Sequence, residues 1–319
     1  MSTARVHRFS HDTSPWQLSI ATHATPHHGA LSLGGFRIAP PERTERPDYD
    51  NDREAVGLAD GMEAKIHWSR LIGAGGPVTR RLGPRLSGGK CVLLPTSAGR
   101  VGAPRDVELL DFALASFAEF ERETGIALVT GQDLGHGMMS DGVTSSLRYL
   151  NDRFAGSVLA DTSKPTAEGN FHVLAGALDA LDIPLDGARV GLIGCGNIGE
   201  HVLSRLLVAG ARVAVLESSP AKRAQLVERG LDVTSPEGKR AFMARPMDAL
   251  VINAGGGTLD PATVGEVAAN REVRIVCGCE NLIMPVSSGE NILRDAGKVF
   301  IPTEFGGMMG YLTAVEEYL

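Results

Sequence analysis

Cysteine is scarce in this sequence, with four residues in a chain of 319, and aromatic side chains make up only 5%. Four cysteines in a chain of this length exclude a small disulfide scaffold. No apolar run approaches the ~18–20 residues that a membrane helix needs, so the membrane is excluded as a partner. A net charge of −7 argues against a nucleic-acid-binding surface. An ordinary globular protein remains.

The four cysteines are interpreted as free thiols in a reducing compartment. Cys277 and Cys279 are too closely spaced for the usual metal-binding pair, and no set of histidines and cysteines surrounds them, so no metal site is predicted. The opening MSTARVHRFSHDTSPW lacks the apolar core of a secretory signal. We therefore expect a cytoplasmic protein.

Glycine is abundant, with 39 residues, many of them in short loops between β-branched runs. From Arg189 onward, strands are expected at residues 189–194, 212–217, 249–254, 274–279 and 298–302. Helices are expected over residues 197–210 and from Pro220, with Ser219 as the N-cap. Short apolar strands separated by helices are typical of a doubly wound parallel sheet of the Rossmann type.

The first half has a different pattern. Strands are expected at residues 16–24, 30–39, 90–95 and 126–133, and helices at residues 53–72 and 106–123. Residues 40–53, rich in proline and charge, are interpreted as an exposed loop. We predict an α/β fold with two domains, residues 1–142 and 143–319.

The string GCGNIG stands between the first strand and the first helix of the second domain. It places Gly194, Gly196 and Gly199 in the G-x-G-x-x-G pattern of dinucleotide-binding folds. The first glycine permits a tight turn, the second lets a pyrophosphate approach the backbone, and the third allows close helix–strand packing. The phosphates would bind at the positive end of the helix, where Asn197 and Ile198 begin it. The alternative is a glycine turn in a fold that binds nothing.

An acidic residue follows at the expected distance. Glu217 ends the next strand 23 residues after Gly194, against the ~20 expected for an acid that binds the ribose diol. Because a carboxylate repels a 2′-phosphate, NAD is predicted in preference to NADP. Lys222 and Arg223 would weaken that preference unless they lie on the exposed face of the next helix.

Six further strings stand in a fixed order along the chain: ALSLGGFR (30–37), DGMEAKIHWSRL (60–71), LSGGKCVL (86–93), TGQDLGHG (130–137), SKPTAEG (163–169) and GCENLIMP (278–285). With the glycine fingerprint, they resemble the motifs of the amino-acid dehydrogenases that act on glutamate, leucine, phenylalanine and valine, and the leucine-type branch most closely. The resemblance implies reversible oxidative deamination, in which an amino acid, NAD⁺ and water give a 2-oxo acid, ammonium and NADH. It assigns substrate binding and subunit contacts to residues 1–142 and NAD to residues 143–319, with the last helix returning to the cleft.

The resemblance also implies roles for single residues. Lys90 would be the catalytic base and Asp133 the proton carrier for the leaving amine. Lys65 and the backbone N–H groups around Gly34 and Gly35 would bind the substrate carboxylate. The nicotinamide and its ribose would be contacted by Thr166, Ala254 and Asn281. In other interpretations Asp133 caps a helix, Lys65 is a solvated lysine, and His136 is a surface histidine rather than a proton relay.

The chemistry of a lysine base can be checked against elementary values. An unperturbed lysine has a pKa of ~10.4, and a base that works near neutral pH needs a value of ~7–8. Desolvation can lower a lysine pKa by up to ~3–5 units, and a second lysine nearby adds repulsion. A pair of lysines with one acid is therefore a sensible catalytic set.

The substrate side chain would meet four uncharged residues, Leu33, Gly131, Met308 and Tyr311. Glutamate is therefore disfavoured, and an apolar, aromatic or unusual amino acid is favoured, although the hydroxyl of Tyr311 offers a polar contact. Lys65 and Lys90 stand 25 residues apart, about double the family's spacing. The extra segment IGAGGPVTRRLGPR is expected to form a loop over or beside the cleft.

Two other functions remain open at this point. One is a reductase of the same fold that acts on an imine or an oxo group without ammonia. The other is a non-catalytic relative that binds NAD(H) as a sensor or assembly part. A symmetric homo-oligomer, a dimer or larger, is the expectation for such an enzyme.

Overall fold

The computed structural model describes residues 3–317, apart from the side chain of Glu42, and its chain divides into two compact units. Unit 1 comprises Met1–Thr162 and Tyr311–Leu319, and unit 2 comprises Ser163–Gly310. This division lies later than the predicted boundary between residues 142 and 143. The reason is that Leu150 of α5 (Ser146–Asn151) is buried in the same hydrophobic core as α4 (Asp106–Thr124) of unit 1.

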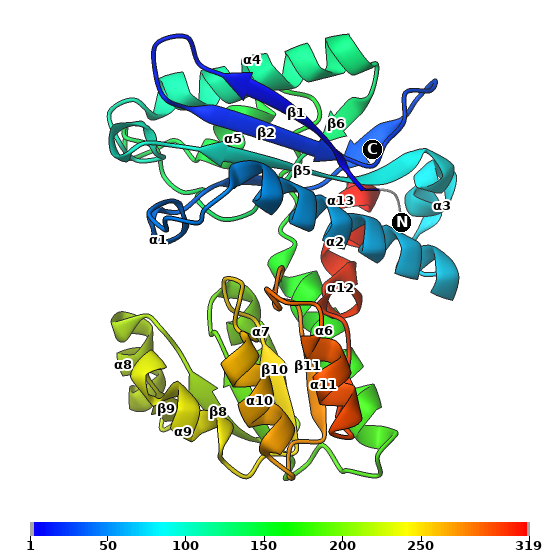
Figure 1. The fold of residues 1–319 in the computed structure, drawn as a ribbon, viewed down its shortest axis with the longest axis vertical. Coiled ribbons are helices and arrows are strands. Elements are labelled where there is room, and N and C mark those ends of the chain that lie inside the picture. Colours follow the sequence, from blue (N-terminus) through cyan, green and yellow to red (C-terminus); the bar gives the residue numbers. More distant parts are fainter. Residues whose placement is uncertain (1–2, 318–319) are drawn as a thin grey trace. The chain divides into compact units, whose positions relative to one another are not determined.

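Unit 1 is a mixed sheet with a long helix on each face (Figure 1). Its strands are β1 (Arg5–Ser10), β2 (Gln17–Thr22), β3 (Leu31–Leu33), β4 (Phe36–Ile38), β5 (Leu86–Leu94) and β6 (Ala127–Val129), in the order β1-β2-β5-β3-β6 with β4 also paired to β5. Helix α4 covers one face and encloses the aromatic core around Phe117 and Phe120. Helix α2 (Asn51–Ile72) packs on the other face, against β5 and β2.

Unit 2 is a six-stranded parallel sheet in the order β12-β11-β10-β7-β8-β9. The strands are β7 (Arg189–Ile193), β8 (Arg212–Leu216), β9 (Asp232–Thr234), β10 (Ala249–Ile252), β11 (Ile275–Gly278) and β12 (Val299–Phe300). Read along the chain this is the strand order 3-2-1-4-5-6 of the Rossmann fold, so the predicted α/β architecture with a Rossmann sheet is confirmed.

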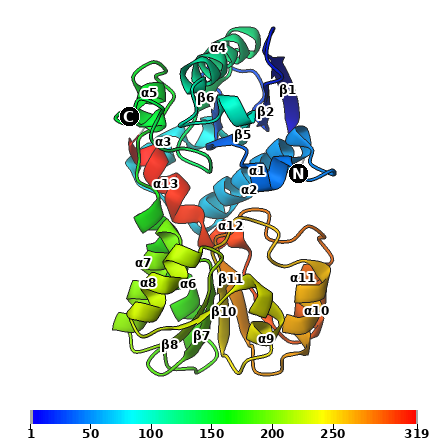
Figure 2. The same ribbon diagram turned by 90° about the vertical axis from the view of Figure 1, so that its left-hand side faces the viewer.

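Alternate residues of the unit 2 strands enter two separate cores. In β10, Ala249 and Val251 face one core and Leu250 and Ile252 face the other. Figure 2 shows the sheet between these two layers of helices. One layer contains α6 (Ser163–Asp179), α7 (Asn197–Val208) and α8 (Pro220–Glu228), and the other contains α9 (Lys239–Met243), α10 (Pro261–Ala269) and α11 (Gly289–Asp295). The short α12 (Thr303–Gly306) leads into α13 (Met308–Glu317), whose residues from Tyr311 belong to unit 1.

Three predictions about elements need correction. The strand expected at residues 30–39 is two strands, because the chain bends at Gly34 and Gly35. The exposed loop expected at residues 40–53 contains a short helix, α1 (Pro41–Thr44), and the start of α2, where Asp50 accepts from the N–H groups of Asp52 and Arg53. The loop expected between Lys65 and Lys90 contains helix α3 (Pro77–Leu82). Strand β1 at the edge of the sheet was not predicted.

Candidate active site

Lys90 lies on β5 and projects toward α2. Alternation along the strand turns Cys91 and Leu93 into the core beneath α4, and Gly88, Lys90 and Val92 to the opposite face. A Cβ atom at Gly88 would overlap the backbone of Glu63 on α2, so the helix lies directly on the strand at this point. The close approach explains why glycine is needed before Lys90 and why Lys90 is buried.

Lys65 on α2 reaches the same environment. Its side chain is buried, and its charge is one of the causes that lower the pKa of Lys90. The structure therefore places the two predicted lysines near each other although they are 25 positions apart in the sequence.

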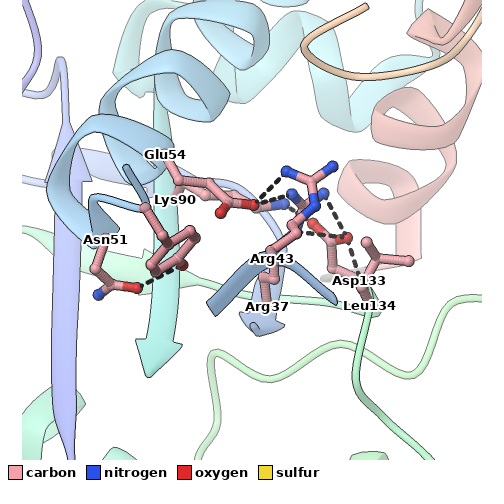
Figure 3. Close-up of polar contacts among 8 residues, drawn as sticks. Arg37, Arg43, Asn51, Glu54, Lys90, Asp133 and Leu134 are labelled. Atoms are coloured by element: carbon pink, nitrogen blue, oxygen red, sulfur yellow. Dashed lines mark hydrogen bonds and ion pairs between the residues drawn. The ribbon is translucent and has the colours of Figure 1, made fainter. Parts of the chain in front are cut away.

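Asp133 lies in the loop after β6, and its carboxylate contacts two cations (Figure 3). Its Oδ2 forms an ion pair with Lys90 Nζ, and its Oδ1 accepts from Arg37 Nε and Nη2 at 3.3 and 3.1 Å. The N–H of Leu134 also donates to Oδ1, at 2.6 Å. Both carboxylate oxygens of Asp133 are thus occupied by contacts with Lys90, Arg37 and the Leu134 N–H. Lys90 and Asp133, the two predicted catalytic residues, lie in direct contact.

The sequence analysis assigned no role to Arg37, which lies on β4. Only 3% of its surface is exposed, and its guanidinium pairs with Glu54 of α2 as well as with Asp133. Glu54 also accepts from Arg43, at 2.9 Å. The available signal was the single charged residue of the buried strand Phe36–Ile38, because a buried arginine needs acidic partners.

Opposing electrostatic effects set the charge states of the pair. Burial lowers the pKa of Lys90, and the positive charges of Arg37 and Lys65 lower it further, which outweighs the opposite effect of Asp133. Burial alone would raise the pKa of Asp133, but Arg37 and Lys90 hold it below its ordinary value. The lysine is therefore easier to deprotonate than an exposed one, and the aspartate is ionised.

Gly35 lies against the Lys90 ammonium. A Cβ atom at Gly35 would stand 2.9 Å from Lys90 Nζ and 3.3 Å from Asp133 Cβ. At Gly34 a Cβ atom would overlap the carbonyl oxygen of Gly89, and the Gly34 N–H already donates to Val129 O at 3.0 Å. Of the two predicted carboxylate-binding glycines, Gly34 therefore uses its N–H within unit 1.

His136 is not the surface histidine that the sequence suggested. Its Nε2 donates to the carbonyl oxygen of Phe36 at 2.8 Å, which fixes the proton on that nitrogen, and Nδ1 lies 3.1 Å from Ser146 Oγ. Burial lowers the pKa of His136, so the ring is held neutral beside the charged cluster.

The predicted pocket residues are divided between the units. Leu33 on β3 is buried and Gly131 lies just after β6, both in unit 1. Tyr311 is also in unit 1, where its hydroxyl is hydrogen-bonded to that of Ser69 on α2. Ser69 follows Lys65 by one helical turn, so Tyr311 contacts the face of α2 that carries Lys65. Met308 is buried and belongs to unit 2.

The glycine fingerprint of unit 2 has the predicted geometry. Gly194 has a φ of +81°, which an L side chain rarely adopts, and a Cβ at Gly199 would overlap the Gly194 carbonyl. A Cβ at Gly196 would have no heavy atom of the described residues within 4 Å. Helix α7 begins at Asn197 and Ile198, directly after this open position.

Glu217 lies beside the fingerprint, at the end of β8. Its carboxylate accepts from the N–H of Cys195 and from that of Ser219, both at 2.7 Å. The neighbouring cations have partners of their own: Lys222 pairs with Glu200 at 2.8 Å, and Arg223 donates to the carbonyls of Glu217 and Ser218.

Two loops at the carboxyl edge of the sheet are held together by a residue that was not predicted. Glu280 is buried and accepts from the N–H groups of Ala254 and Thr258, at 3.1 and 2.9 Å, and from the Thr258 hydroxyl at 2.7 Å. It precedes Asn281 in the chain, so it fixes two predicted cofactor contacts, Ala254 and Asn281, in adjoining loops. Thr166 is buried at the start of α6, which packs on β11.

The residues present fit a dinucleotide. Asn170 Nδ2 donates to Asn253 Oδ1 at 2.8 Å, while among the described residues Asn170 Oδ1 and Asn253 Nδ2 are buried without a hydrogen-bond partner. Both lie near the fingerprint, since a Cβ at Gly194 would stand 2.7 Å from Asn253 O. An unused donor and an unused acceptor beside open backbone suit a ligand rich in hydroxyl and amide groups.

Residues 3–317 contain neither a metal-binding cluster nor a membrane-spanning helix. No group of three or more histidine, cysteine or acidic side chains is arranged to hold a metal ion. Within the same residues, no helix combines the length and the apolar character needed to cross a membrane. All four cysteines are buried, and none forms a disulfide.

Comparisons with known proteins agree with this description. No family model matches the chain. The valine dehydrogenase of Streptomyces albus is 27% identical over 307 residues, which cover 93% of this chain and 75% of that protein, and the valine dehydrogenase of Streptomyces virginiae matches equally well, with 76% of its length covered.

Solved structures have the same fold. L-Tryptophan dehydrogenase from Nostoc punctiforme superposes with a TM-score of 0.64 at 20% identity, over 98% of this chain and 81% of that one. Hetero-hexameric glutamate dehydrogenase from Thermus thermophilus, in its leucine-bound form, gives a TM-score of 0.68 at 18% identity, over 99% and 74%. Together these matches support the family inferred from the motifs, the amino-acid dehydrogenases of glutamate, leucine, phenylalanine and valine.

Proposed function

We propose that this protein is a pyridine-nucleotide-dependent amino-acid dehydrogenase that oxidatively deaminates an L-amino acid to a 2-oxo acid and ammonium, or catalyses the reverse. The matches to valine and tryptophan dehydrogenases support this reaction class rather than the two alternatives considered from the sequence. The observation that carries the proposal is the buried ion pair of Lys90 and Asp133, in which the lysine has a lowered pKa.

Lys90 is the proposed base. Water that attacks the imine carbon must lose a proton, and Lys90 in its neutral form accepts it. Burial and the nearby cations favour that neutral form. The ion pair with Asp133 fixes the position of Nζ, which general-base catalysis requires.

Asp133 is the proposed proton carrier. Because its pKa is held below the ordinary value, it is ionised at rest and would hold a proton only while passing it on. The proton that Lys90 gains from water then passes through Asp133 to the amine, which leaves as the neutral molecule. Lys65 is the proposed anchor of the substrate carboxylate, because it places a second buried cation near Lys90.

Unit 2 supplies the proposed cofactor site. Gly194, Gly196 and Gly199 would hold the pyrophosphate together with the N-terminal N–H groups of α7, and Thr166, Ala254 and Asn281 would hold the nicotinamide end. A nicotinamide bound there would supply the acceptor for the hydride from the amino-acid Cα. Glu217 at the end of β8 supports NAD as the preferred form, because its carboxylate disfavours a 2′-phosphate.

The proposed substrate is an amino acid with an apolar, aromatic or unusual side chain. Leu33, Gly131, Met308 and Tyr311 bring no charge, so a glutamate carboxylate would remain unpaired. The hydroxyl pair of Tyr311 and Ser69 is a polar feature that a simple aliphatic pocket lacks.

A cytoplasmic, homo-oligomeric enzyme, a dimer or larger, is part of the proposal. Buried cysteines without disulfides are what a reducing compartment favours, and closed symmetric assemblies are the rule for soluble enzymes.

A screen of NADH absorbance tests the proposed function. The protein is mixed with NAD⁺ or NADP⁺ and branched-chain, aromatic, acidic and unusual amino acids, and in reverse with NADH, ammonium and 2-oxo acids. We expect oxidation of an apolar or aromatic amino acid, preference for NAD⁺, and no reduction of the 2-oxo acid without ammonium. Reduction that proceeds without ammonium, or no turnover of any amino acid, contradicts the proposal.

A further inference from the structure

Arg37 occupies a position where a charged side chain is costly. It lies in the middle of β4, between Phe36 and Ile38, which are buried in the core beneath α4. Alternation along the strand turns Arg37 to the opposite face, where it pairs with Glu54 of α2. A buried guanidinium is tolerated only when acidic groups and hydrogen bonds surround it.

Its two partners connect it to Lys90. One end of the guanidinium donates to Asp133 Oδ1, and Nη1 pairs with Glu54, which also accepts from Arg43 (Figure 3). Asp133 in turn pairs with Lys90. The five side chains form a line of alternating charge, with cations at both ends and Arg37 in the centre.

We propose that Arg37 is a positioning residue for the base: it binds Oδ1 of Asp133 while Lys90 binds Oδ2, and so limits how strongly that carboxylate stabilises the lysine ammonium, while Glu54 and Arg43 hold Arg37 from the other side. This inference rests on the proposed function for its role in catalysis, although the arrangement itself does not depend on it. Arg37 is assigned no contact with substrate.

The arrangement has an electrostatic consequence. Asp133 interacts with both Lys90 and Arg37. It therefore stabilises the ammonium form of Lys90 less than a carboxylate that contacted Lys90 alone. A bidentate arginine suits this role because its planar group can serve two carboxylates at once, whereas a lysine cannot.

Other titratable groups also face this cluster. Lys65 adds positive charge near Lys90, and the Cys91 thiol, on the other face of β5, stays neutral because burial raises its pKa to about 12. His136 is neutral beside Asp133, and the pKa of Tyr49, near Glu54 and Arg37, is raised by burial. Within the Lys90–Asp133 pair, Lys90 is the member whose charge can change, because the pKa of Asp133 is held below its ordinary value.

Two substitutions are expected to act in opposite directions. Arg37→Met removes a cation and leaves Asp133 to Lys90 alone, so Lys90 should hold its proton to higher pH, by about one unit. Glu54→Gln removes the anion behind Arg37 and makes the surroundings of Lys90 more positive, so Lys90 should lose its proton at lower pH. Arg37→Lys keeps a charge and should shift Lys90 less than Arg37→Met.

The test is a titration of the full-length protein by NMR of the lysine ε-carbons. The Lys90 signal is assigned by its loss in Lys90→Met. Arg189 provides a matched control, because it also bridges two carboxylates, Asp248 and Glu272, at 2.7 Å each, but in unit 2. Arg189→Met should leave the Lys90 midpoint unchanged. Thermal unfolding and NADH affinity verify that each variant is folded.

A higher midpoint in Arg37→Met with a lower one in Glu54→Gln supports the inference. An unchanged midpoint, or shifts in the same direction in both variants, overturns it. If Arg37→Met does not fold, the direction of the Glu54→Gln shift still decides, because a purely structural role predicts none.

The pH dependence of amino-acid oxidation separates this inference from the proposed function. If the variants shift both the Lys90 midpoint and the acid limb of kcat/KM, both proposals stand. If the midpoints shift in a protein that oxidises no amino acid, the positioning role stands and the proposed function falls. If the protein oxidises an amino acid and no midpoint moves, the proposed function stands and the positioning role falls.

Discussion

The side chain of Lys90 shows how burial changes the use of a residue. An exposed lysine has a pKa of ~10.4 and is an ammonium ion throughout the neutral range. Burial beneath α2 destabilises that ion. Asp133 offsets only part of this destabilisation, because Arg37 also binds the Asp133 carboxylate. The interactions among Lys90, Asp133 and Arg37 therefore determine whether Lys90 can act as a base.

This balance predicts the pH dependence of turnover. Since the pKa of Lys90 is lowered by burial, its neutral form appears as the pH rises through a midpoint below ~10.4. We expect kcat/KM to increase with pH and to level off above that midpoint, measured as initial rates of NADH formation with saturating NAD⁺. A limb at or above the value of an ordinary lysine would contradict this assignment.

A pair of adjacent glycines separates a catalytic effect from a folding effect. In Gly35→Ala the new methyl group meets the mobile end of Lys90, so we expect a folded protein with reduced turnover. In Gly34→Ala it overlaps the backbone of Gly89, which costs about 1–3 kcal/mol of stability. Circular dichroism melts and NADH formation measure the two effects, and equal losses of stability in both variants would contradict the assignment.

At the residue scale, the sequence predicted Lys90, Asp133 and the fingerprint glycines because each stands in a short motif with its own chemistry. Arg37 and Glu54 were missed because Arg37 pairs with Glu54 and with Asp133, and these contacts join segments far apart in the chain. Glu280 was missed for a similar reason, because its carboxylate is satisfied by a loop that follows a different strand. Sequence motifs therefore identify reacting groups more easily than they identify the residues that position those groups.

At the scale of single elements, the turn from β7 into α7 combines two kinds of glycine. Gly199→Ala would push a methyl group into the carbonyl of Gly194, whereas Gly196→Ala would meet no heavy atom of the described residues within 4 Å. We therefore expect Gly199→Ala to lose stability, and Gly196→Ala to melt like the wild type but bind NADH more weakly. Calorimetric melting and fluorescence titration with NADH measure both. Unchanged NADH affinity in Gly196→Ala would show that the glycine fingerprint does not contact the cofactor.

Helix α3 depends on a contact with α13. Glu316 accepts from the N–H groups of Val78 and Thr79, at 3.2 and 2.9 Å, and from the Thr79 hydroxyl at 2.6 Å, and so caps the start of α3. We expect Glu316→Ala to lower the free energy of unfolding by about 1 kcal/mol, as the loss of a helix cap does. Glu317→Ala, an exposed neighbour, is the control.

The Thr79 hydroxyl lowers the pKa of Glu316, so this stabilisation is present at neutral pH and is lost as the pH falls through that lowered value. Denaturant unfolding at neutral and acid pH measures the difference. A difference between Glu316→Ala and wild type that grows on acidification would contradict the cap.

The elements that the sequence predicted well are those with a long apolar period. Helices α2 and α4 and five of the six strands of unit 2 lie within a few residues of their predicted ranges, while the short β9 was not predicted. Helix α3 was expected as a loop because PVTRRL is too short to show a period and its cap comes from α13. The edge strand β1, RVHRFS, mixes polar and apolar residues without a buried face and was missed for that reason.

At the scale of the whole molecule, the chain enters unit 2 at Ser163 and returns to unit 1 at Tyr311. A boundary based on composition cannot detect this return, because the last residues have the same apolar helical character as those before them. The return places Tyr311 beside Ser69, and thus makes a residue from the end of the chain part of the α2 face that holds Lys65.

The central claim is that a buried lysine of unit 1 performs the chemistry while unit 2 binds the cofactor. It is tested most directly by Lys90→Met, with Lys298→Met, which removes another buried lysine, from unit 2, as the control. We expect Lys90→Met to lose about 10²–10⁴-fold in the rate of NADH formation from the preferred amino acid while its NADH affinity stays unchanged. Near-normal turnover in Lys90→Met would contradict the account.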